Sequence, residues 1–364
     1  MQIPKKKIYI LTNTLLQGGA EKQSVLLAKN LKVFYDVTMI IYYGKRVDTR
    51  LLNVVNENNI NIIYLKGNLL NKFIYLISLF KSNKKTVIIS YLATTNIINA
   101  VIGAISGVKY RIGGIRSSQL DPFKLRVQRF LHNKLLSHTV CNNYSALNYI
   151  GVNGFKLSHA SVIHNSIEVQ EKVKKQMGFN RSITILTVGR FVPEKDFHTT
   201  IHSFKVLLEN QKPYSFNIKL IIIGYGDQEN YIRNLVNELN LSSNVEIYIN
   251  PANLRDYYKN SDIYLSTSLF EGLSNSIMEA MEFSLPVVAT NVGDNKYLVL
   301  EGESGFLLPV GDTAGISDKL KWLIENPDKR KEFGIKSYLH LKNNFSEEEF
   351  TKKYITLIEG LCNE

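Results

Sequence analysis

Two glutamates, Glu271 and Glu279, stand eight positions apart in a segment whose residue types suit the binding of a phosphorylated sugar. The apolar and small residues 262–268 before them predict a short buried strand, and residues 274–283 predict a helix. Glu271 is therefore expected in the strand-to-helix loop, and Glu279 about one and a half turns into the helix. Such a helix N-terminus binds phosphate, and the deeper carboxylate can accept two ribose hydroxyls. The residues whose backbone N–H groups would meet the anion are Gly272, Leu273, Ser274 and Asn275.

Two cations are predicted to lie near this anion site. Arg190 and Lys195 stand in the loop after the strand predicted at 183–189. A bound diphosphate would need both charges, because the chain contains no D-x-D pair to hold a divalent metal. Arginine grips phosphate oxygens with two parallel hydrogen bonds, and lysine adds a point charge. Gly189 and Gly224 follow neighbouring predicted strands, where a glycine lets the backbone approach a ligand or simply forms a tight turn.

A second glycine-containing turn stands near the start of the chain. Gly18, Gly19 and Glu21 follow the first predicted strand and open a helix, an arrangement that suits a phosphate of donor or acceptor. A dinucleotide-binding loop is the competing interpretation of this turn. It fails on spacing, because the segment has no G-x-G-x-x-G pattern.

The elements that must position these residues alternate along the whole chain. In the first half, strands are predicted at 7–12, 37–42, 61–65, 86–90, 110–113, 138–141 and 160–163, and helices at 20–32, 69–82, 95–106, 122–136 and 143–150. The pattern restarts with strands at 183–189, 218–223, 245–249, 262–266, 286–289 and 305–308, and helices at 196–210, 227–240, 252–259, 274–283 and 313–326. Closing helices are predicted at 328–343 and 346–361. Alternation of this kind predicts parallel sheets covered by helices, and the restart predicts two of them.

The α/β pattern and the length of 364 residues predict two Rossmann-like domains facing each other across a cleft. The predicted bounds are 1–165 for the first domain, 166–182 for a polar connection, 183–345 for the second domain and 346–364 for a C-terminal helix. The connection contains the polar run 168–175. The first domain is assigned to the acceptor and the second to the nucleotide sugar.

Charge is distributed unevenly between the two halves. The formal net charge is +12, and the excess of basic residues lies before residue 176, which indicates an anionic partner for the first half. Cys141 and Cys362 are the only cysteines, which provides neither a disulfide framework nor metal-ligand spacing and fits a reducing cytosol. Residues 1–16 are interpreted as a first strand rather than a signal peptide, and no apolar run approaches the 18 residues or so of a membrane span.

The segment around Glu271 and Glu279 resembles the E-x7-E element of retaining glycosyltransferases of the GT-B fold, especially the bacterial family 4 group. The element G-R-x-x-x-x-K at 189–195 and the G-G-A-E segment at 18–21 resemble the same family. The resemblance implies that Arg190, Lys195 and Glu271 are catalytic. It also implies that the donor is bound by Gly189, Gly224, Gly272, Leu273, Ser274, Asn275 and Glu279. In this family the last helix commonly returns to the first domain, and the resemblance implies the same for the helix at 346–364.

Two places depart from the family pattern. Many relatives carry a donor-sugar histidine near the end of the fifth strand, where this chain has Arg116 in the segment 113–118. Arg116 is therefore grouped with Gly18, Gly19 and Glu21 on the acceptor or phosphate side. The segment 164–168 resembles the family's interdomain turn in altered form. The histidines His132, His138, His159 and His164 are interpreted as structural or surface residues.

Two basic amphipathic segments of the first half allow two interpretations. Residues 69–85 and 123–136 combine apolar residues at helical spacing with lysine and arginine. Each could lie in an anionic membrane interface, or could pack its apolar stripe on the sheet and leave its cations in water. The basicity of the first half favours peripheral membrane contact, at the inner face of the cytoplasmic membrane.

The function predicted from these features is a retaining, metal-independent glycosyltransferase of the hexosyltransferase type. It would use a UDP- or GDP-linked sugar as substrate, without a cofactor or metal, and a glycan or polyprenyl-diphosphate-linked acceptor of bacterial capsule or lipopolysaccharide synthesis. One rival is a GT-B epimerase or phosphorylase, which would share the phosphate site. The other is a basic nucleic-acid-binding protein, which would explain the charge but not the second domain; no nucleic-acid partner is expected, since no binding module is recognisable.

Overall fold

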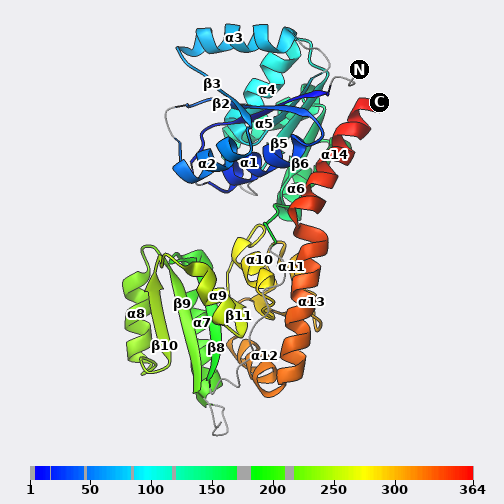
Figure 1. Ribbon diagram of the computed structural model, residues 1–364. Coiled ribbons are helices and arrows are strands. Elements are labelled where there is room, and N and C mark those ends of the chain that lie inside the picture. Colours follow the sequence, from blue (N-terminus) through cyan, green and yellow to red (C-terminus); the bar gives the residue numbers. More distant parts are fainter. Residues whose placement is uncertain are drawn as a thin grey trace. The chain divides into compact units, whose positions relative to one another are not determined.

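The computed structural model describes residues 5–16, 18–44, 47–82, 86–116, 120–169, 182–209 and 217–363. The chain divides into two compact units, which are Met1–Ser166 with Glu347–Glu364, and Ile167–Ser346 (Figure 1). We call them unit 1 and unit 2. Most of the expected connection, residues 170–181, lies outside the described residues, as do Gln17, Ser117, Ser118 and the basic pair Lys84 and Lys85.

Unit 1 contains a parallel sheet in the order β3-β2-β1-β4-β5-β6-β7. Its order reverses between β1 and β4, which creates the point where the carboxyl ends of doubly wound sheets bind ligands. The strands are β1 (Lys7–Thr12), β2 (Asp36–Ile41), β3 (Asn61–Tyr64), β4 (Val87–Ser90), β5 (Tyr110–Ile115), β6 (His138–Cys141) and β7 (Ala160–Val162).

Alternate side chains of β1 show which helices cover each face of this sheet. Ile8 and Ile10 pack with α1 (Gly19–Leu31), α2 (Thr49–Glu57) and α14 (Glu347–Asn363). Tyr9 and Leu11 pack on the other face with α3 (Leu69–Lys81) and α4 (Ala93–Ile105), and α4 also contacts α5 (Pro122–Lys134). Successive strand residues point to opposite faces, so α3, α4 and α5 form one helical layer and α1, α2 and α14 the other. The helix α6 (Tyr144–Val152) and the 3₁₀ turn η1 (Leu157–His159) lead into β7.

Unit 2 contains a parallel sheet in the order β10-β9-β8-β11-β12-β13. Its order reverses between β8 and β11. The strands are β8 (Ser182–Arg190), β9 (Asn217–Tyr225), β10 (Val245–Ile249), β11 (Ile263–Ser266), β12 (Val287–Thr290) and β13 (Gly305–Leu308). Its helices are α7 (Phe197–Glu209), α8 (Glu229–Glu238), α9 (Leu254–Asn260), α10 (Asn275–Glu282), α11 (Asn295–Leu298), α12 (Thr313–Glu325) and α13 (Pro327–Phe345), with a 3₁₀ turn η2 at Pro193–Lys195.

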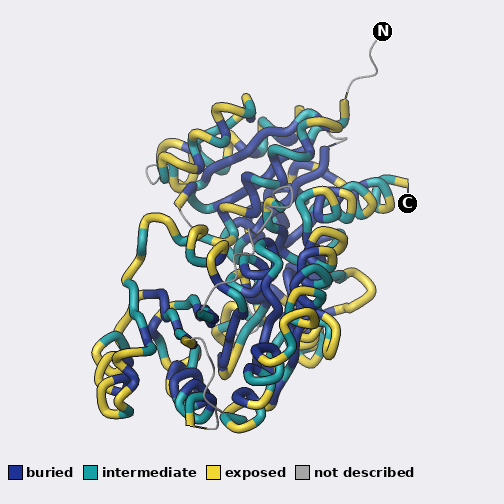
Figure 2. The backbone as a smooth tube through the Cα atoms, turned by 60° about the horizontal axis from the view of Figure 1, so that its bottom comes forward, coloured by how far each residue is buried: buried dark blue, intermediate teal, exposed yellow. Residues whose placement is uncertain are grey.

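Two apolar layers enclose the unit 2 sheet. Ile183 and Ile185 of β8 belong to a buried cluster with residues of α7, α8 and α12. Leu186 belongs to a second cluster with residues of α10 and α13. Figure 2 shows that the buried segments are concentrated in the strands, while the helices and loops carry the exposed ones. The sheet is therefore a rigid platform, and its loops are the parts that can present polar groups to a ligand.

The predicted strands are all present, with ends within about two residues of the prediction. Two helices were not predicted, α2 and α11. The first begins where the Asp48 carboxylate accepts the backbone N–H groups of Arg50 and Leu51, a capping signal that the sequence contained. None of the described helices combines the length and the hydrophobicity that a bilayer-spanning segment requires.

Candidate donor-binding site

The predicted donor residues lie at the carboxyl edge of the unit 2 sheet, where the strand order reverses. Arg190 is the last residue of β8, Lys195 lies in the loop after it, and the loop after β11 contains Glu271. Strands β8 and β11 are neighbours in the sheet, so both loops leave the same edge side by side. The fold thus brings together two segments that stand about 75 residues apart in the sequence.

Backbone and hydroxyl bonds join these two loops. The Leu269 N–H donates to the Glu194 carbonyl at 2.9 Å, and the Thr267 hydroxyl donates to the Asp196 carbonyl at 2.8 Å. Asp196 has a left-handed backbone, with φ of 47°, that ends the η2 turn. The position of Lys195 relative to the β11 loop is therefore fixed by the backbone rather than by its own flexible side chain.

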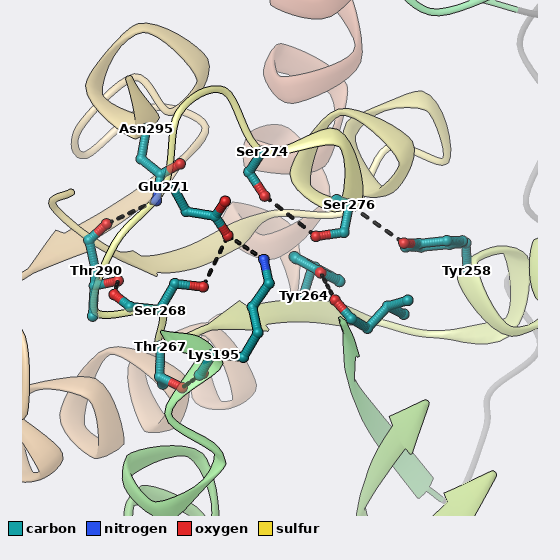
Figure 3. A network of polar contacts seen from close by, with 11 residues as sticks. Lys195, Tyr258, Tyr264, Thr267, Ser268, Glu271, Ser274, Ser276, Thr290 and Asn295 are labelled. Atoms are coloured by element: carbon teal, nitrogen blue, oxygen red, sulfur yellow. Dashed lines mark hydrogen bonds and ion pairs between the residues drawn. The ribbon is translucent and has the colours of Figure 1, made fainter. Parts of the chain in front are cut away.

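Lys195 and Glu271 form an ion pair at the centre of this site (Figure 3). Their side chains are 20% and 12% exposed, so the pair is shielded from most of the solvent. The Glu271 carboxylate also accepts the Ser268 hydroxyl at 2.9 Å. The methylene groups of Lys195 lie close over Gly189, where a Cβ would come within 3.3 Å of them. The lysine stem thus crosses the strand end, and its ammonium points to the β11–α10 loop.

Helix α10 begins beside this pair without a side-chain cap. Ser274 is the N-cap residue in extended conformation, and in the described chain its hydroxyl pairs with the Ser276 hydroxyl at 3.3 Å instead of capping the backbone. Leu273 and Ser274 are buried, whereas Asn275 is exposed. The first N–H groups of an α-helix have no partner within the helix and, together with the helix dipole, favour an anion at this end.

Glu279 lies on α10 and is oriented by a buried tyrosine. The Tyr258 hydroxyl, from α9, donates to the Glu279 carboxylate at 2.9 Å. Burial raises the pKa of Tyr258 well above its ordinary value, and the charges of Tyr264 and Glu279 raise it further. Because this phenol stays protonated, it remains a donor to the carboxylate. Tyr264 lies next to it, and its hydroxyl donates to the Val188 carbonyl at 3.1 Å.

The turn after β12 supports the Glu271 loop from behind. The Thr290 hydroxyl donates to the Ser268 carbonyl at 2.6 Å, and the Asp294 N–H donates to the Gly272 carbonyl at 2.9 Å. Gly293 has a φ of 54°, and a Cβ at this position would lie 2.0 Å from the Glu271 carbonyl oxygen. The turn can pack this closely only with glycine there.

Arg190 and Gly224, two further predicted donor residues, differ in their exposure to solvent. Arg190 is exposed at the carboxyl end of β8. Gly224 is buried, and a Cβ there would lie 1.9 Å from the Gly189 carbonyl oxygen. The close approach of β9 to β8 therefore accounts for Gly224, and its predicted contact with the donor stays a prediction.

The predicted acceptor-side residues lie in unit 1. Gly18 is the N-cap of α1, and the Glu21 carboxylate folds back so closely that a Cβ on Gly18 would lie 2.1 Å from it. Glu21 also accepts the Thr14 hydroxyl at 3.0 Å, while Gly19 is exposed with open space around it. The chain thus already places one negative charge at this helix N-terminus, where a phosphate was predicted.

Arg116 packs into unit 1 at the end of β5. Its guanidinium lies 4.2 Å from the centroid of the Tyr91 ring and donates to the Asn165 side chain at 2.6 Å. Burial, the larger effect, raises the pKa of Tyr354 on α14, and the nearby Arg116 charge lowers it in part. Through Arg116, the end of β5 therefore contacts Asn165 and the C-terminal helix α14, all within unit 1.

Sequence reasoning missed several residues of the site. It gave no role to Ser268, Tyr258 or Gly293. Ser268 stands three positions before Glu271, so its hydroxyl was within reach in the predicted loop. Tyr258 could not be found in this way, because its contact with Glu279 depends on how α9 packs on α10. Among the described residues, no three His, Cys, Asp or Glu side chains gather as metal ligands.

Comparisons with known proteins agree with this geometry. Residues 169–340 match the family described as Glycosyl transferases group 1, which places the match within unit 2. The chain is 25% identical over 318 residues to the Staphylococcus aureus capsular polysaccharide biosynthesis glycosyltransferase CapM, which covers 80% of this chain and 82% of that protein.

A second relative is the Campylobacter jejuni α-1,4-N-acetyl-D-galactosaminyltransferase whose name specifies a diNAcBac-PP-undecaprenol-linked substrate. It is 24% identical over 335 residues, which cover 90% of this chain and 91% of that protein. The crystal structure of Anabaena HepE in complex with UDP superposes with a TM-score of 0.80 at 16% identity, and covers 98% of this chain and 100% of that one. The predicted pair of Rossmann-like domains of the GT-B fold is thus confirmed, and the chain is a glycosyltransferase.

Proposed function

We propose that this glycosyltransferase is retaining and metal-independent, and that it moves a sugar from a UDP- or GDP-linked donor to a polyprenyl-diphosphate-linked glycan in bacterial capsule or lipopolysaccharide synthesis. The observation that carries the proposal is the shielded Lys195–Glu271 pair beside the uncapped start of α10. The names of the relatives from Staphylococcus aureus and Campylobacter jejuni support the acceptor class, and the UDP complex of HepE supports the donor class.

The leaving diphosphate would be bound by cations and backbone amides. An ammonium group has three donors, so Lys195 can keep Glu271 as a partner and still reach a phosphate oxygen. The amides of residues 272–275 and the exposed Arg190 would complete the site. Donors placed where charge develops stabilise the transition state, and the loss of one such donor costs on the order of 10²–10³ in rate.

Glu279 and Glu271 would have different tasks. Glu279, oriented by Tyr258, would accept the ribose hydroxyls. Glu271 would position the sugar hydroxyls rather than act as a covalent nucleophile. Its carboxylate is already held by the Lys195 ammonium and the Ser268 hydroxyl, and hydrogen bonds of this kind reduce the electron density available for attack on carbon. In the proposed mechanism Arg190 and Lys195 would supply the positive charge at the diphosphate in place of a metal ion.

Calorimetric titration of the full chain with UDP and with GDP, in the presence of EDTA, tests the donor site. We expect micromolar binding of one nucleotide and weakening of about tenfold or more in Glu279→Ala. Glu238→Ala, which removes an exposed carboxylate on α8, is the matched control and should bind as the wild type does. Failure of both nucleotides to bind would overturn the donor assignment.

Product analysis tests the reaction itself. With the nucleotide sugar of the bound base and a polyprenyl-diphosphate-linked glycan, transfer should continue in EDTA, and NMR should show the anomeric configuration of the donor in the product. Inversion of that configuration would refute retention, and loss of transfer on chelation would refute metal independence. Conversion of the nucleotide sugar without an acceptor would instead identify an epimerase.

A further inference from the structure

The outer surface of the helical layer α3–α4–α5 in unit 1 is both apolar and basic. The large exposed side chains on it are Leu69, Leu70, Ile74, Tyr75, Ile97, Ile105, Phe123 and Phe130. These helices cover one face of the sheet next to one another, because α4 contacts both α3 and α5 (Figure 1). Water-exposed apolar side chains gathered over three adjacent helices mark an interaction surface rather than scattered exceptions.

The helical spacing places these side chains on the outward side. Phe123, Arg126, Phe130 and Lys134 recur every three or four residues along α5 and are all exposed, while Leu131 and Gln128 of the same helix are buried. Ile97 and Ile105 stand eight apart on α4, and Leu70 and Ile74 four apart on α3, with Leu76 and Phe80 buried on the opposite side of α3. Each helix therefore has an inner apolar stripe for the sheet and a second, outer one.

The charge on this layer is almost entirely positive. Between residues 58 and 167 the sequence contains thirteen lysines and arginines and a single acidic residue, Asp121. The Asp121 carboxylate caps α5 by accepting the N–H groups of Phe123 and Lys124, and no ion pair described in the structure involves it. Lys81, Lys124 and Arg126 are exposed, and no described ion pair involves them. A cationic field of this extent attracts an anionic surface.

We propose that the outer surface of α3–α4–α5 docks unit 1 on an anionic lipid bilayer. The exposed leucine, isoleucine and phenylalanine side chains enter the interface, and the lysines and arginines between them contact lipid phosphates. This inference deepens the proposed function and rests on it for its purpose, because a polyprenyl-linked acceptor is confined to a membrane. Nucleic acid fits less well, since aliphatic leucine and isoleucine side chains provide neither stacking nor hydrogen bonds to bases.

Co-sedimentation of the full chain with vesicles tests the surface. Vesicles of phosphatidylcholine with phosphatidylglycerol should bind the wild type, and vesicles of phosphatidylcholine alone should bind it at least about tenfold more weakly. Phe130→Glu and Ile74→Glu should each weaken binding to the anionic vesicles by about tenfold or more. Phe34→Glu is the matched control, because Phe34 is equally exposed but follows α1, on the other face of the sheet.

The same samples separate this inference from the proposed function. Melting temperature and UDP or GDP binding should be unchanged in Phe130→Glu and Ile74→Glu, because both side chains are exposed in unit 1. The docking surface would be refuted if the wild type failed to bind anionic vesicles, bound neutral vesicles equally well, or was displaced from anionic vesicles by a competing oligonucleotide. An equal loss of vesicle binding in Phe34→Glu would also refute it. Vesicle binding without nucleotide binding would overturn the proposed donor site and leave the docking surface intact.

Discussion

Replacement of Gly293 by alanine should damage the donor site, although it replaces no residue that is predicted to contact the donor. Gly293 stands in the turn after β12, and its backbone has a φ of 54°. The added Cβ would lie 2.0 Å from the Glu271 carbonyl oxygen and 2.8 Å from the Gly272 carbonyl oxygen. Since both obstacles are backbone atoms, no side-chain rotation can relieve the contact. The loop that holds Glu271 must move instead.

The size of the movement and its cost follow from these contacts. A carbon–oxygen contact is comfortable from about 3.3 Å, so the turn and the Glu271 loop must separate by about 1 Å. The left-handed backbone costs alanine about 1 kcal/mol, and the forced shift adds about 1–3 kcal/mol in free energy of unfolding. A misplacement of about 1 Å at a site of this kind can cost about 100-fold in rate.

Denaturant unfolding and nucleotide calorimetry on the same variant measure both effects. Gly302→Ala is the matched control, because Gly302 also has a left-handed backbone, with φ of 71°, but no atom lies within 4 Å of an added Cβ. The control should lose about 1 kcal/mol of stability and keep the wild-type affinity for UDP or GDP. Gly293→Ala should lose more stability and bind the nucleotide at least about tenfold more weakly.

Two results would refute this reasoning. Gly293→Ala with wild-type affinity would mean that the turn does not position the Glu271 loop. Equal loss of affinity in Gly302→Ala would mean that nucleotide binding follows overall stability rather than the geometry of the loop. A crystal structure of Gly293→Ala should show the carbonyl groups of Glu271 and Gly272 displaced away from residue 293.

Three further predictions concern hydrogen bonds, burial and protonation. Tyr258→Phe should weaken nucleotide binding about fivefold in calorimetry, since about 1 kcal/mol goes with the lost hydrogen bond to Glu279. Tyr264→Phe, which removes a hydroxyl that donates to the Val188 carbonyl and interacts with Ser276 and Tyr258, should weaken binding less, and an equal or larger loss would contradict the role of Tyr258. Arg255→Ala should lower the free energy of unfolding in urea by about 1–2 kcal/mol, because it leaves the buried Glu282 carboxylate without its half-exposed guanidinium partner. A variant as stable as the wild type would contradict this prediction. Burial and two neighbouring histidines lower the pKa of His138 to about 4. As the pH falls from about 6.5 to about 4, His138 therefore binds a proton in the unfolded chain but not in the native one. Up to about 3 kcal/mol of stability should be lost between these pH values, and His138→Asn should reduce that loss in unfolding titrations; an unchanged loss would contradict the assignment.

The strands were predictable because each fully buried strand is a short apolar run bounded by polar or turn residues, as in 87–90 and 263–266. The helices α2 and α11 were missed for different reasons. Residues 48–57 contain the capping Asp48 and apolar residues at helical spacing, so the signal was present and was overlooked. Residues 295–298 form a single turn, which is too short for periodicity to indicate.

The composition of the candidate site followed from local chemistry. The spacing of Glu271 and Glu279 placed one carboxylate in a loop and the other within α10, and both are there. Arg190 and Lys195 were expected after the first strand of the second domain, and the structure has them at the end of β8 and in the η2 turn. Features of this kind depend on residues that are close in sequence, which is why the sequence alone reveals them.

The partners of those residues were decided by tertiary structure. The reversal of strand order between β8 and β11 brings Lys195 to Glu271, and the packing of α9 on α10 brings Tyr258 to Glu279. The sequence alone likewise determined that residues 58–167 are basic and almost free of carboxylates. Only the fold decided that the exposed apolar stripes of α3, α4 and α5 share one layer, because that depends on which face of the sheet each crossover covers.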